Sequence, residues 1–306
     1  MGKGLKLGTR GSPLAMAQAA MVAAALEAAH GWAQGAVEIV PITTSGDRIQ
    51  DRPLADIGGK ALWTKELDRV LLEGGTDLSV HSLKDVESVR PGGIRIAAVL
   101  PRADPRDRII GAPSIAALKL GGVVGTSSPR RKAQLLSARP DLTVVPLRGN
   151  VGTRLAKLEG GEVEAMFLAA AGLQRLGMGG VGAPVPVEEM LPAPTQAVIA
   201  VERRAEDTAT GSLLAAIDHA ETNAAMRAER AFVAALGGTC HSPIGALARV
   251  KGGRIAMQVQ LLSEDGGATM ADEADFAVGD DEAPRQLARS LLHRAPASIR
   301  KLFEAA

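Results

Sequence analysis

The chain has 306 residues, of which 46% are hydrophobic and 23% charged, and its formal net charge is +1. This length and composition are typical of a globular protein with two or three domains. The near-zero charge and the aromatic content of 2% disfavour nucleic acid as a partner, because the chain has neither a broad basic field nor many stacking platforms.

The start of the chain and its apolar segments indicate the compartment. Residues 1–7, MGKGLKL, contain no apolar core and no cleavage site of a signal peptide. No segment has the length and apolarity of a membrane span. A single thiol without an export signal is typical of the cytosol. The sequence therefore predicts a cytoplasmic protein without a membrane partner.

The first two-thirds of the chain alternates predicted strands and helices. The strands are residues 5–7, 37–43, 78–81, 94–100, 123–125, 143–147 and 165–170, and the helices are residues 13–29, 61–73, 130–138 and 151–159. This alternation predicts parallel α/β sheets with crossover helices. Two helices also begin alike, because Ser12-Pro13 and Ser128-Pro129 are each followed by three residues and then by Ala-Gln. Serine at the N-cap and proline at the first helical position favour helix initiation, and the echo predicts two α/β domains of related topology.

The pattern changes after about residue 220. A helix is predicted at residues 222–236, followed by strands at 246–250 and 255–262 around a Gly-Gly turn. A second turn at residues 265–267 precedes a terminal helix that starts near residue 283 and is interrupted near Pro296. These elements predict a small α+β domain with an antiparallel sheet.

Cys240 is the only cysteine of the chain, in the loop Gly-Gly-Thr-Cys-His-Ser-Pro at residues 237–243. It cannot form a disulfide within the chain or complete a zinc site with several cysteines. It is a buried apolar filler, a nucleophile or an anchor for a covalent group. The flanking glycines and proline predict a turn at the surface.

Basic residues recur where predicted loops meet helices or strands end. They are Arg10, Lys60, Arg130, Arg131, Arg148 and Arg154. A positive charge in the first turn of a helix opposes the helix dipole, so its repetition favours a ligand with several negative groups. For a single arginine of the set, a solvated surface position is the simpler explanation. No phosphate-binding glycine motif is present, which favours carboxylates, the partners of bidentate arginine.

Asp85 follows the predicted strand 78–81, where α/β folds place ligands. Among basic groups it would stay ionised and could stabilise a cation or transfer a proton, although an aspartate there can also simply cap a helix. His81 is interpreted as a core residue at the end of the strand. No spacing of His, Cys or carboxylates predicts a metal site.

Taken together, the chain resembles the porphobilinogen deaminase (hydroxymethylbilane synthase) family along nearly its whole length. The segments that carry the resemblance are residues 8–19, 43–48, 58–72, 77–86, 124–135, 147–158, 169–177, 191–202 and 229–245. The resemblance implies two α/β domains like type II periplasmic binding proteins, residues 1–100 with 196–217 and residues 101–195, and a third, α+β domain at residues 220–306.

The resemblance implies a transferase that links four porphobilinogen molecules head to tail into hydroxymethylbilane, the linear precursor of haem and other tetrapyrroles. It implies a dipyrromethane cofactor, bound through a thioether to Cys240. The expected cofactor contacts are Lys84, Asp85, Ser128, Arg130, Arg131 and Arg148. The expected substrate contacts are Arg10, Ser12, Arg148, Arg154, Arg175 and Gln196. Each pyrrole carries an acetate and a propionate, which agrees with the carboxylate ligand expected from the arginines.

By the same resemblance, Asp85 is the catalytic residue, which assists loss of ammonia and stabilises the positive pyrrole nitrogen of the azafulvene intermediate. Lys60 lies on a loop, residues 45–60, that is expected to cover the site and exclude water. Segments 102–107 and 194–200 are expected hinges, and the family precedent is a monomer. The chain departs from the usual family pattern at Thr239 before the cysteine, at Thr195 and Ala197 around Gln196, at Trp63 and at Glu87.

Two other functions fit parts of the sequence. A cytosolic anion-binding module without catalysis requires only the twin α/β domains and the basic junctions, and needs neither the third domain nor Cys240. A transcriptional effector-binding domain is disfavoured, because no helix-turn-helix segment or basic arm is evident.

Overall fold

The computed structural model describes residues 4–44, 64–239 and 241–303. The chain forms two compact units, residues 1–102 with 198–223 and residues 103–197 with 224–306. The boundaries at 102/103 and 197/198 fall inside the two segments expected to be hinges. The predicted division into three domains stays a prediction.

The first unit contains a five-stranded sheet in the order β2-β1-β3-β10-β4. The strands are β1 (Leu5–Arg10), β2 (Val37–Ile42), β3 (Leu78–Ser82), β4 (Ile94–Val99) and β10 (Ile199–Arg204). β1 pairs in parallel with β2 and β3, whereas β10 runs antiparallel to both β3 and β4. One strand of the sheet therefore comes from a part of the chain about a hundred residues after the other four.

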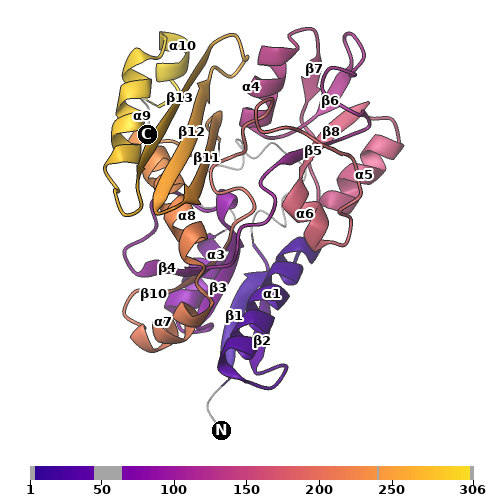
Figure 1. Cartoon of the computed structure of the whole chain (residues 1–306). Helices are drawn as coiled ribbons and strands as arrows, with labels where there is room; N and C mark the ends of the chain where they lie inside the picture. The colour runs from indigo at the N-terminus through magenta and orange to yellow at the C-terminus, as the bar shows by residue number, and fades with distance from the viewer. Residues whose placement is uncertain (1–3, 45–63, 240, 304–306) are drawn as a thin grey trace. The chain divides into compact units, whose positions relative to one another are not determined.

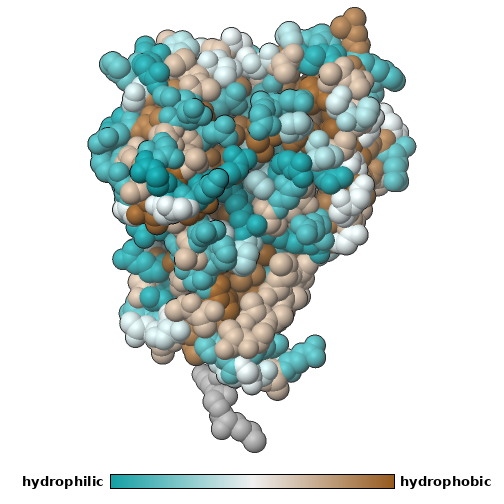
Figure 2. All heavy atoms as spheres, viewed as in Figure 1, coloured by the Kyte–Doolittle hydropathy of each residue, from teal (hydrophilic) through white to brown (hydrophobic). Residues whose placement is uncertain are grey.

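Helices pack on this sheet and build the first core. They are α1 (Pro13–His30), α3 (Lys65–Leu72), α7 (Thr208–Leu214) and the short 3₁₀ helices η1 (Leu83–Asp85) and η2 (Ala215–Ile217). α1 buries Ala19, Val22 and Leu26, spaced three and four residues apart, against Leu7, Val80 and Val201 of the sheet. Each large apolar side chain buried in this way contributes about 1.5–3 kcal/mol. The opposite side of α1 is alanine-rich, and Figure 2 shows it as a pale brown area.

The second unit contains a sheet of the same design, in the order β7-β6-β8-β5-β9. The strands are β5 (Asp107–Ile110), β6 (Val123–Gly125), β7 (Thr143–Val145), β8 (Ala165–Ala169) and β9 (Ala183–Pro184). β6 is parallel to β7 and β8, and β5 is antiparallel to β8 and β9. The two sheets thus share one strand order, which agrees with the related topology predicted from the echo between Ser12 and Ser128. In both sheets the fourth strand is reversed, so the sheets are mixed and not purely parallel as predicted.

Both faces of this second sheet are buried. Its helices are α4 (Pro129–Ala138), α5 (Val151–Glu159) and α6 (Ala170–Arg175). Phe167 of β8 belongs to one core cluster, and its neighbours Met166 and Leu168 belong to the other. The alternation of side chains along a strand produces this division, and it explains why β8 is an uninterrupted apolar run.

The rest of the second unit is an antiparallel sheet with helices on one face (Figure 1, orange to yellow). Its elements are α8 (Ala220–Leu236), which begins in the first unit, β11 (Ile244–Lys251), β12 (Arg254–Leu262), β13 (Thr269–Ala277), α9 (Ala283–Arg294) and α10 (Ala297–Arg300). Ile255, Met257 and Val259 of β12 alternate toward Phe232 of α8 and Leu291 of α9. The predicted fold class, α/β with a smaller α+β part, is confirmed.

The structure also corrects the predicted elements. β5, β9, β10 and β13 were not predicted as strands, and β1 extends three residues beyond the predicted strand. β13, with the sequence TMADEADFA, is polar because it is an edge strand on which only Phe276 is buried. α3 begins at Lys65, and residues 61–63 of the predicted helix lie outside the described residues.

Candidate functional site

In the first unit, predicted site residues follow the ends of two neighbouring strands. β1 ends at Arg10 and β3 at Ser82, and the two strands are parallel, with Leu7 opposite Leu78. The ends of adjacent parallel strands lie at one edge of the sheet, where α/β folds place ligands. Arg10, Ser12 and the turn that holds Lys84 and Asp85 therefore share this edge.

Local hydrogen bonds fix both segments of this edge. The hydroxyl of Ser12 caps α1 and accepts a hydrogen bond from the Ala15 backbone N–H at 3.3 Å. Gln18 of α1 bonds to the Ser82 hydroxyl at 2.7 Å and thereby ties the helix to the end of β3. Lys84 and Asp85 lie in the 3₁₀ turn η1, which the Val86 N–H closes by donating to the Leu83 carbonyl at 3.1 Å.

The second unit repeats this arrangement with arginines. Residues 126–131 follow β6, residues 146–154 follow β7, and α6 follows β8, three parallel and adjacent strands. Ser128 caps α4 and accepts a hydrogen bond from the Arg131 N–H at 3.4 Å. The loops touch, because the Ser127 hydroxyl donates to the Leu147 carbonyl at 3.0 Å. The predicted residues Ser128, Arg130, Arg131, Arg148, Arg154 and Arg175 thus share one edge of the second sheet.

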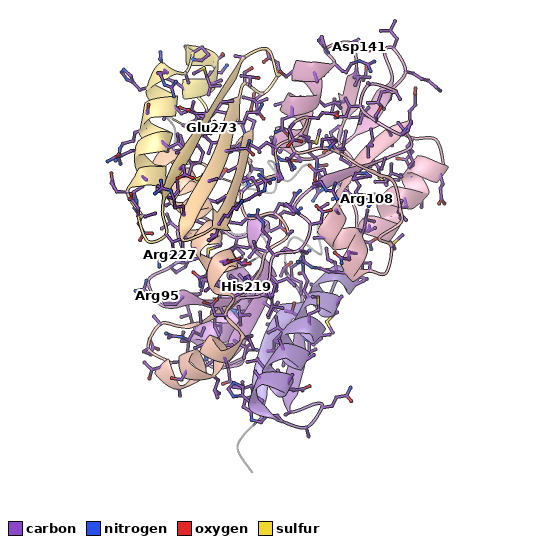
Figure 3. All side chains as sticks on the ribbon, viewed as in Figure 1. Arg95, Arg108, Asp141, His219, Arg227 and Glu273 are labelled. Carbon is purple, nitrogen blue, oxygen red and sulfur yellow. The ribbon has the colours of Figure 1, made fainter. Side chains whose placement is uncertain are left out.

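Arg130 and Arg131 surround a buried carboxylate that the sequence analysis did not single out. Asp107 begins β5, adjacent to Arg108 (Figure 3), and is fully buried. It accepts hydrogen bonds of 2.8 Å from Arg130 Nη2, Arg131 Nη2 and Gln196 Nε2. Burial alone would raise the pKa of Asp107, but the two guanidinium groups hold it below its ordinary value.

Arg130, Arg131 and Gln196 also donate hydrogen bonds to backbone carbonyl groups of the second unit. Arg131 also donates to the Phe167 carbonyl and Arg130 to the Leu191 carbonyl, both at 2.9 Å. The amide of Gln196, itself 1% exposed, additionally donates to the Pro105 carbonyl at 2.7 Å. Among the described residues, the buried Nε atoms of the two arginines have no hydrogen-bond partner.

Two further arginines at this edge have donors without a partner. The buried Nη1 of Arg148 and the buried Nε of Arg175 have none among the described residues. Arg175 donates through Nη2 to the Ala197 carbonyl at 2.6 Å, and burial lowers its pKa to about 10. Desolvated donors without an acceptor are unfavourable unless a ligand supplies one, so this edge suits a carboxylate-bearing ligand.

The turn between Arg148 and α5 depends on one glycine. Gly149 has φ 115, and a Cβ there would lie 2.7 Å from Thr153 Cγ2. This turn lets Asn150 cap α5 through Thr153 N–H at 2.9 Å, and Arg154 donates from Nε to the Gly149 carbonyl at 2.8 Å. Local structure therefore places Arg148 and Arg154 on either side of the cap.

Two predicted residues, Lys60 and Cys240, lie outside the described residues, as does Trp63. The neighbours of Cys240, Thr239 and His241, are both exposed. They belong to a loop closed by hydrogen bonds of 3.1 Å from Thr239 N–H to the Ser242 hydroxyl and from His241 N–H to the Thr239 hydroxyl. His81 is buried in β3, as expected of a core residue. No group of three or more potential metal ligands occurs among the described residues.

Comparison with protein families assigns the chain. The family model "Porphobilinogen deaminase, dipyromethane cofactor binding domain" matches residues 5–212. The chain belongs to the porphobilinogen deaminase family. The family's C-terminal domain matches residues 224–295. This member of the porphobilinogen deaminase family is therefore a transferase of tetrapyrrole biosynthesis with a dipyrromethane cofactor, as the resemblance implied.

Curated porphobilinogen deaminases match over almost their whole length. The chain is 54% identical over 305 residues to that of Sphingopyxis alaskensis, covering 98% of this chain and 96% of the relative. It is 49% identical over 300 residues to that of Paracoccus denitrificans, covering 96% of each.

Solved structures with similarity to the chain include periplasmic domains. Substrate-binding domain 2 of Lactococcus lactis GlnP has a TM-score of 0.42 and 10% identity, covering 70% of this chain and 87% of that one. The VFT2 domain of Bordetella pertussis BvgS has a TM-score of 0.39 and 16% identity, covering 70% and 86%. Among the described helices, none is both long and apolar enough to cross a membrane.

Proposed function

We propose that this member of the porphobilinogen deaminase family joins four porphobilinogen molecules into hydroxymethylbilane with the residues at the two sheet edges. The proposal rests on two buried donor atoms, Arg148 Nη1 and Arg175 Nε, which have no hydrogen-bond partner among the described residues, while each arginine as a whole is half-buried. Porphobilinogen and its oligomers carry an acetate and a propionate on every ring. Their carboxylates match the planar donor geometry of arginine.

The described residues fit a dipyrromethane with the same chemistry. Arg148, with Lys84, Ser128 and the remaining Nε donors of Arg130 and Arg131, would hold its carboxylates, and Cys240 would bind it through a thioether. The exposed neighbours of Cys240 are compatible with access of a pyrrole to the thiol. When bound, the dipyrromethane supplies the nucleophilic pyrrole carbon to which the first substrate molecule is joined.

Asp85 is proposed as the catalytic residue. Asp85 follows Lys84 in the turn η1, directly after β3, and the residue is partly exposed. Loss of ammonia from porphobilinogen leaves positive charge that the pyrrole nitrogen shares, and a nearby carboxylate stabilises that charge electrostatically. The same carboxylate can take the proton that the ring loses after the carbon–carbon bond forms, and the resulting carboxylic acid can give that proton to the amine that leaves in the next cycle.

Arg10, Ser12, Arg154, Arg175 and Gln196 are proposed to bind the substrate chain. Arg10 and Ser12 share the edge of the first sheet with Asp85, and Arg154 and Arg175 share the edge of the second sheet with Arg148. The Gln196 amide nitrogen donates to Asp107 and Pro105. Lys60 is proposed to act from a covering loop.

We further propose a cytoplasmic monomer that binds neither nucleic acid nor membranes. The formal net charge of +1 and the low aromatic content support this proposal.

An intact-mass measurement of the purified protein, with peptide mapping around Cys240, tests the covalent anchor. The expected result is a mass excess of two linked pyrrole units on Cys240, and no excess in Cys240→Ser. If the chain is unmodified and incubation with porphobilinogen does not load the thiol, the proposed anchor is wrong. In that case, retained binding of porphobilinogen would favour the alternative anion-binding module.

Asp85→Asn tests the catalytic assignment, because it keeps the shape of the side chain and removes its charge. The variant should fold and carry the cofactor mass, but turn over about 10²–10⁴-fold more slowly, the usual contribution of an acid–base residue. Turnover close to that of the wild type, measured per cofactor-loaded molecule, would contradict the assigned role.

A further inference from the structure

Arg90 is an almost buried guanidinium in the first unit that contacts three carboxylates. Its side chain is 7% exposed. Its Nε and Nη2 donate to the two oxygens of Glu202 at 2.7 and 2.9 Å, in a bidentate pair. Its Nη1 donates to Glu87 at 2.8 Å, and Nη2 also bonds to Asp68. None of these residues belongs to the proposed substrate or cofactor contacts.

These contacts form a closed chain around the turn that carries Lys84 and Asp85. Before the turn, Nε2 of His81, in β3, lies 3.2 Å from Glu202 of β10. After the turn, Glu87 is bonded to Arg90, which in turn is bonded to Glu202. Residues 82–86 are thus enclosed at their base by four side chains, all within one unit. Figure 3 labels Arg95 of β4, the strand that pairs with β10.

The same cluster also binds the beginning of α3. Thr64, the residue before this helix, donates from its hydroxyl to Glu87 at 3.2 Å, and Asp68 lies in the first turn of the helix. Asp68 and Thr64 are both buried. Arg90 therefore connects three segments that are distant in the sequence, namely the start of α3, the loop after η1 and β10.

The cluster is electrostatically expensive, which argues against a role in stability alone. Three carboxylates surround one guanidinium, and the Glu202 side chain is fully buried. Burial would raise the pKa of Glu202, but His81 and Arg90 lower it to about 2, whereas for Asp68 burial prevails and its pKa is raised. Buried ion pairs are often no more stabilising than apolar residues of equal volume, and their attested benefit is a fixed geometry.

We infer that Arg90, together with Glu87 and Glu202, is a positioning residue that holds the Lys84–Asp85 turn in its reactive geometry. The inference rests on the proposed catalytic role of Asp85. Arg90 does not touch the reacting atoms and acts through the backbone of residues 82–87. Small displacements of a catalytic group cost large factors in rate, so loosening the base of the turn should slow chemistry more than it weakens substrate binding.

Glu87→Ala is the most informative variant, since Glu87 is the most exposed carboxylate of the cluster and its loss leaves the bidentate Arg90–Glu202 pair intact. Arg90→Lys keeps the charge but cannot bond to Glu202 and Glu87 with the same planar geometry. Arg69→Met is the matched control. It lies in α3 next to Asp68, and its ion pair with Glu73 is exposed, so its kinetics should be those of the wild type.

The measurement is the rate constant of the first covalent addition of porphobilinogen to cofactor-loaded enzyme under single-turnover conditions. This rate constant does not depend on how many molecules are folded and carry the cofactor. That fraction determines only the amplitude of the reaction. Glu87→Ala should lower the rate constant about 5–50-fold with KM changed less than about threefold, and Arg90→Lys should lower it at least as much. Amide hydrogen exchange of residues 83–88 should be faster in both variants without substrate.

The outcomes separate this inference from the proposal on which it rests. If Asp85→Asn is inactive but Glu87→Ala and Arg90→Lys both retain the wild-type rate constant, the positioning role is wrong and the catalytic assignment stands. If the two variants lose only the amplitude of the single-turnover reaction, and the rate constants and the hydrogen exchange of residues 83–88 are unchanged, the cluster contributes to folding and has no positioning role. If Asp85→Asn itself turns over normally, the catalytic assignment fails first.

Discussion

Single residues of the second unit show how tertiary contacts change the meaning of a charge. The sequence places Arg130 and Arg131 in the first turn of α4, which indicates an anionic ligand. The structure supplies one anion from inside the protein, Asp107, which is fully buried and bonded to both. In each arginine, Nε is the one nitrogen without a hydrogen-bond partner among the described residues, and the bonds to Asp107 fix the orientation of both guanidinium groups.

Asp107→Asn should lower the free energy of unfolding by about 3–5 kcal/mol at pH 7, because it leaves two buried guanidinium groups without their counter-ion. The measurement is urea unfolding of the variant and the wild type. The control is Asp275→Asn, whose pair with Arg254 is more than half exposed and should change stability little. A loss below about 1 kcal/mol in Asp107→Asn would contradict the structural role of the pair.

The same carboxylate predicts a pH dependence. The pKa of Asp107 is lower in the folded protein than its ordinary value of 3.8. The folded state therefore binds fewer protons than the unfolded state, and stability from this group is complete above about pH 4 and is lost as the pH falls further. The wild type should lose stability between about pH 4 and 2 more steeply than Asp107→Asn.

At the scale of elements, the segment before β10 has an unusual backbone. Thr195 and Ala197 have φ values of 59 and 73, and among the described residues they are the only non-glycine residues with positive φ. The backbone N–H of Thr195 donates to Glu229 of α8, whose carboxylate also accepts from Ala248 N–H of β11 at 2.7 Å. Glu229 thus fixes the segment that contains these two residues. A left-handed backbone conformation costs about 1–2 kcal/mol for each of them. The departure from the usual family pattern noted in the sequence coincides with this strain.

Ala197→Gly should therefore stabilise the protein, by about 0.5–1 kcal/mol, because relief of the positive φ outweighs the extra freedom of glycine in the unfolded chain. The Arg175 bond to the Ala197 carbonyl uses the backbone and should be kept. Ala20→Gly, at an exposed position inside α1, is the control with the opposite sign and should destabilise by about 1 kcal/mol. Equal destabilisation by both substitutions would show that Ala197 is not strained.

At the scale of the whole molecule, the chain passes between its compact units at 102/103, 197/198 and 223/224. The first two crossings lie in the segments expected to be hinges, and the second lies directly after the strained Ala197. A tetrapyrrole that grows by one ring per cycle needs additional space at each step. In the two expected hinge segments, changes in a few backbone torsion angles can provide that space without breaking either core.

Binding of porphobilinogen by the cofactor-loaded enzyme should change amide hydrogen exchange in residues 102–107 and 194–200. The reference is β12, Arg254–Leu262, which is paired on both sides and should exchange equally slowly with and without substrate. Unchanged exchange in both linkers, while covalent intermediates accumulate, would exclude them as hinges.

The sequence by itself determined the alternating α/β pattern, the small α+β part, the serine caps at Ser12 and Ser128, and the family. The pattern, the α+β part and the caps depend on local propensity and side-chain periodicity, which neighbouring residues encode. The family follows from the resemblance of nine sequence segments. β10 could not be predicted, because it pairs with strands that lie about a hundred residues earlier in the chain. β5 could not be predicted, because it has only four residues, and two of them, Asp107 and Arg108, are charged. β13 was not predicted, because an edge strand has few apolar side chains in an alternating pattern. Only the tertiary structure decided that Asp107 pairs with Arg130 and Arg131 and that Arg90 joins Asp68, Glu87 and Glu202. The partners of a buried charge lie up to 112 residues apart, and the burial that makes these contacts strong exists only after the chain has folded.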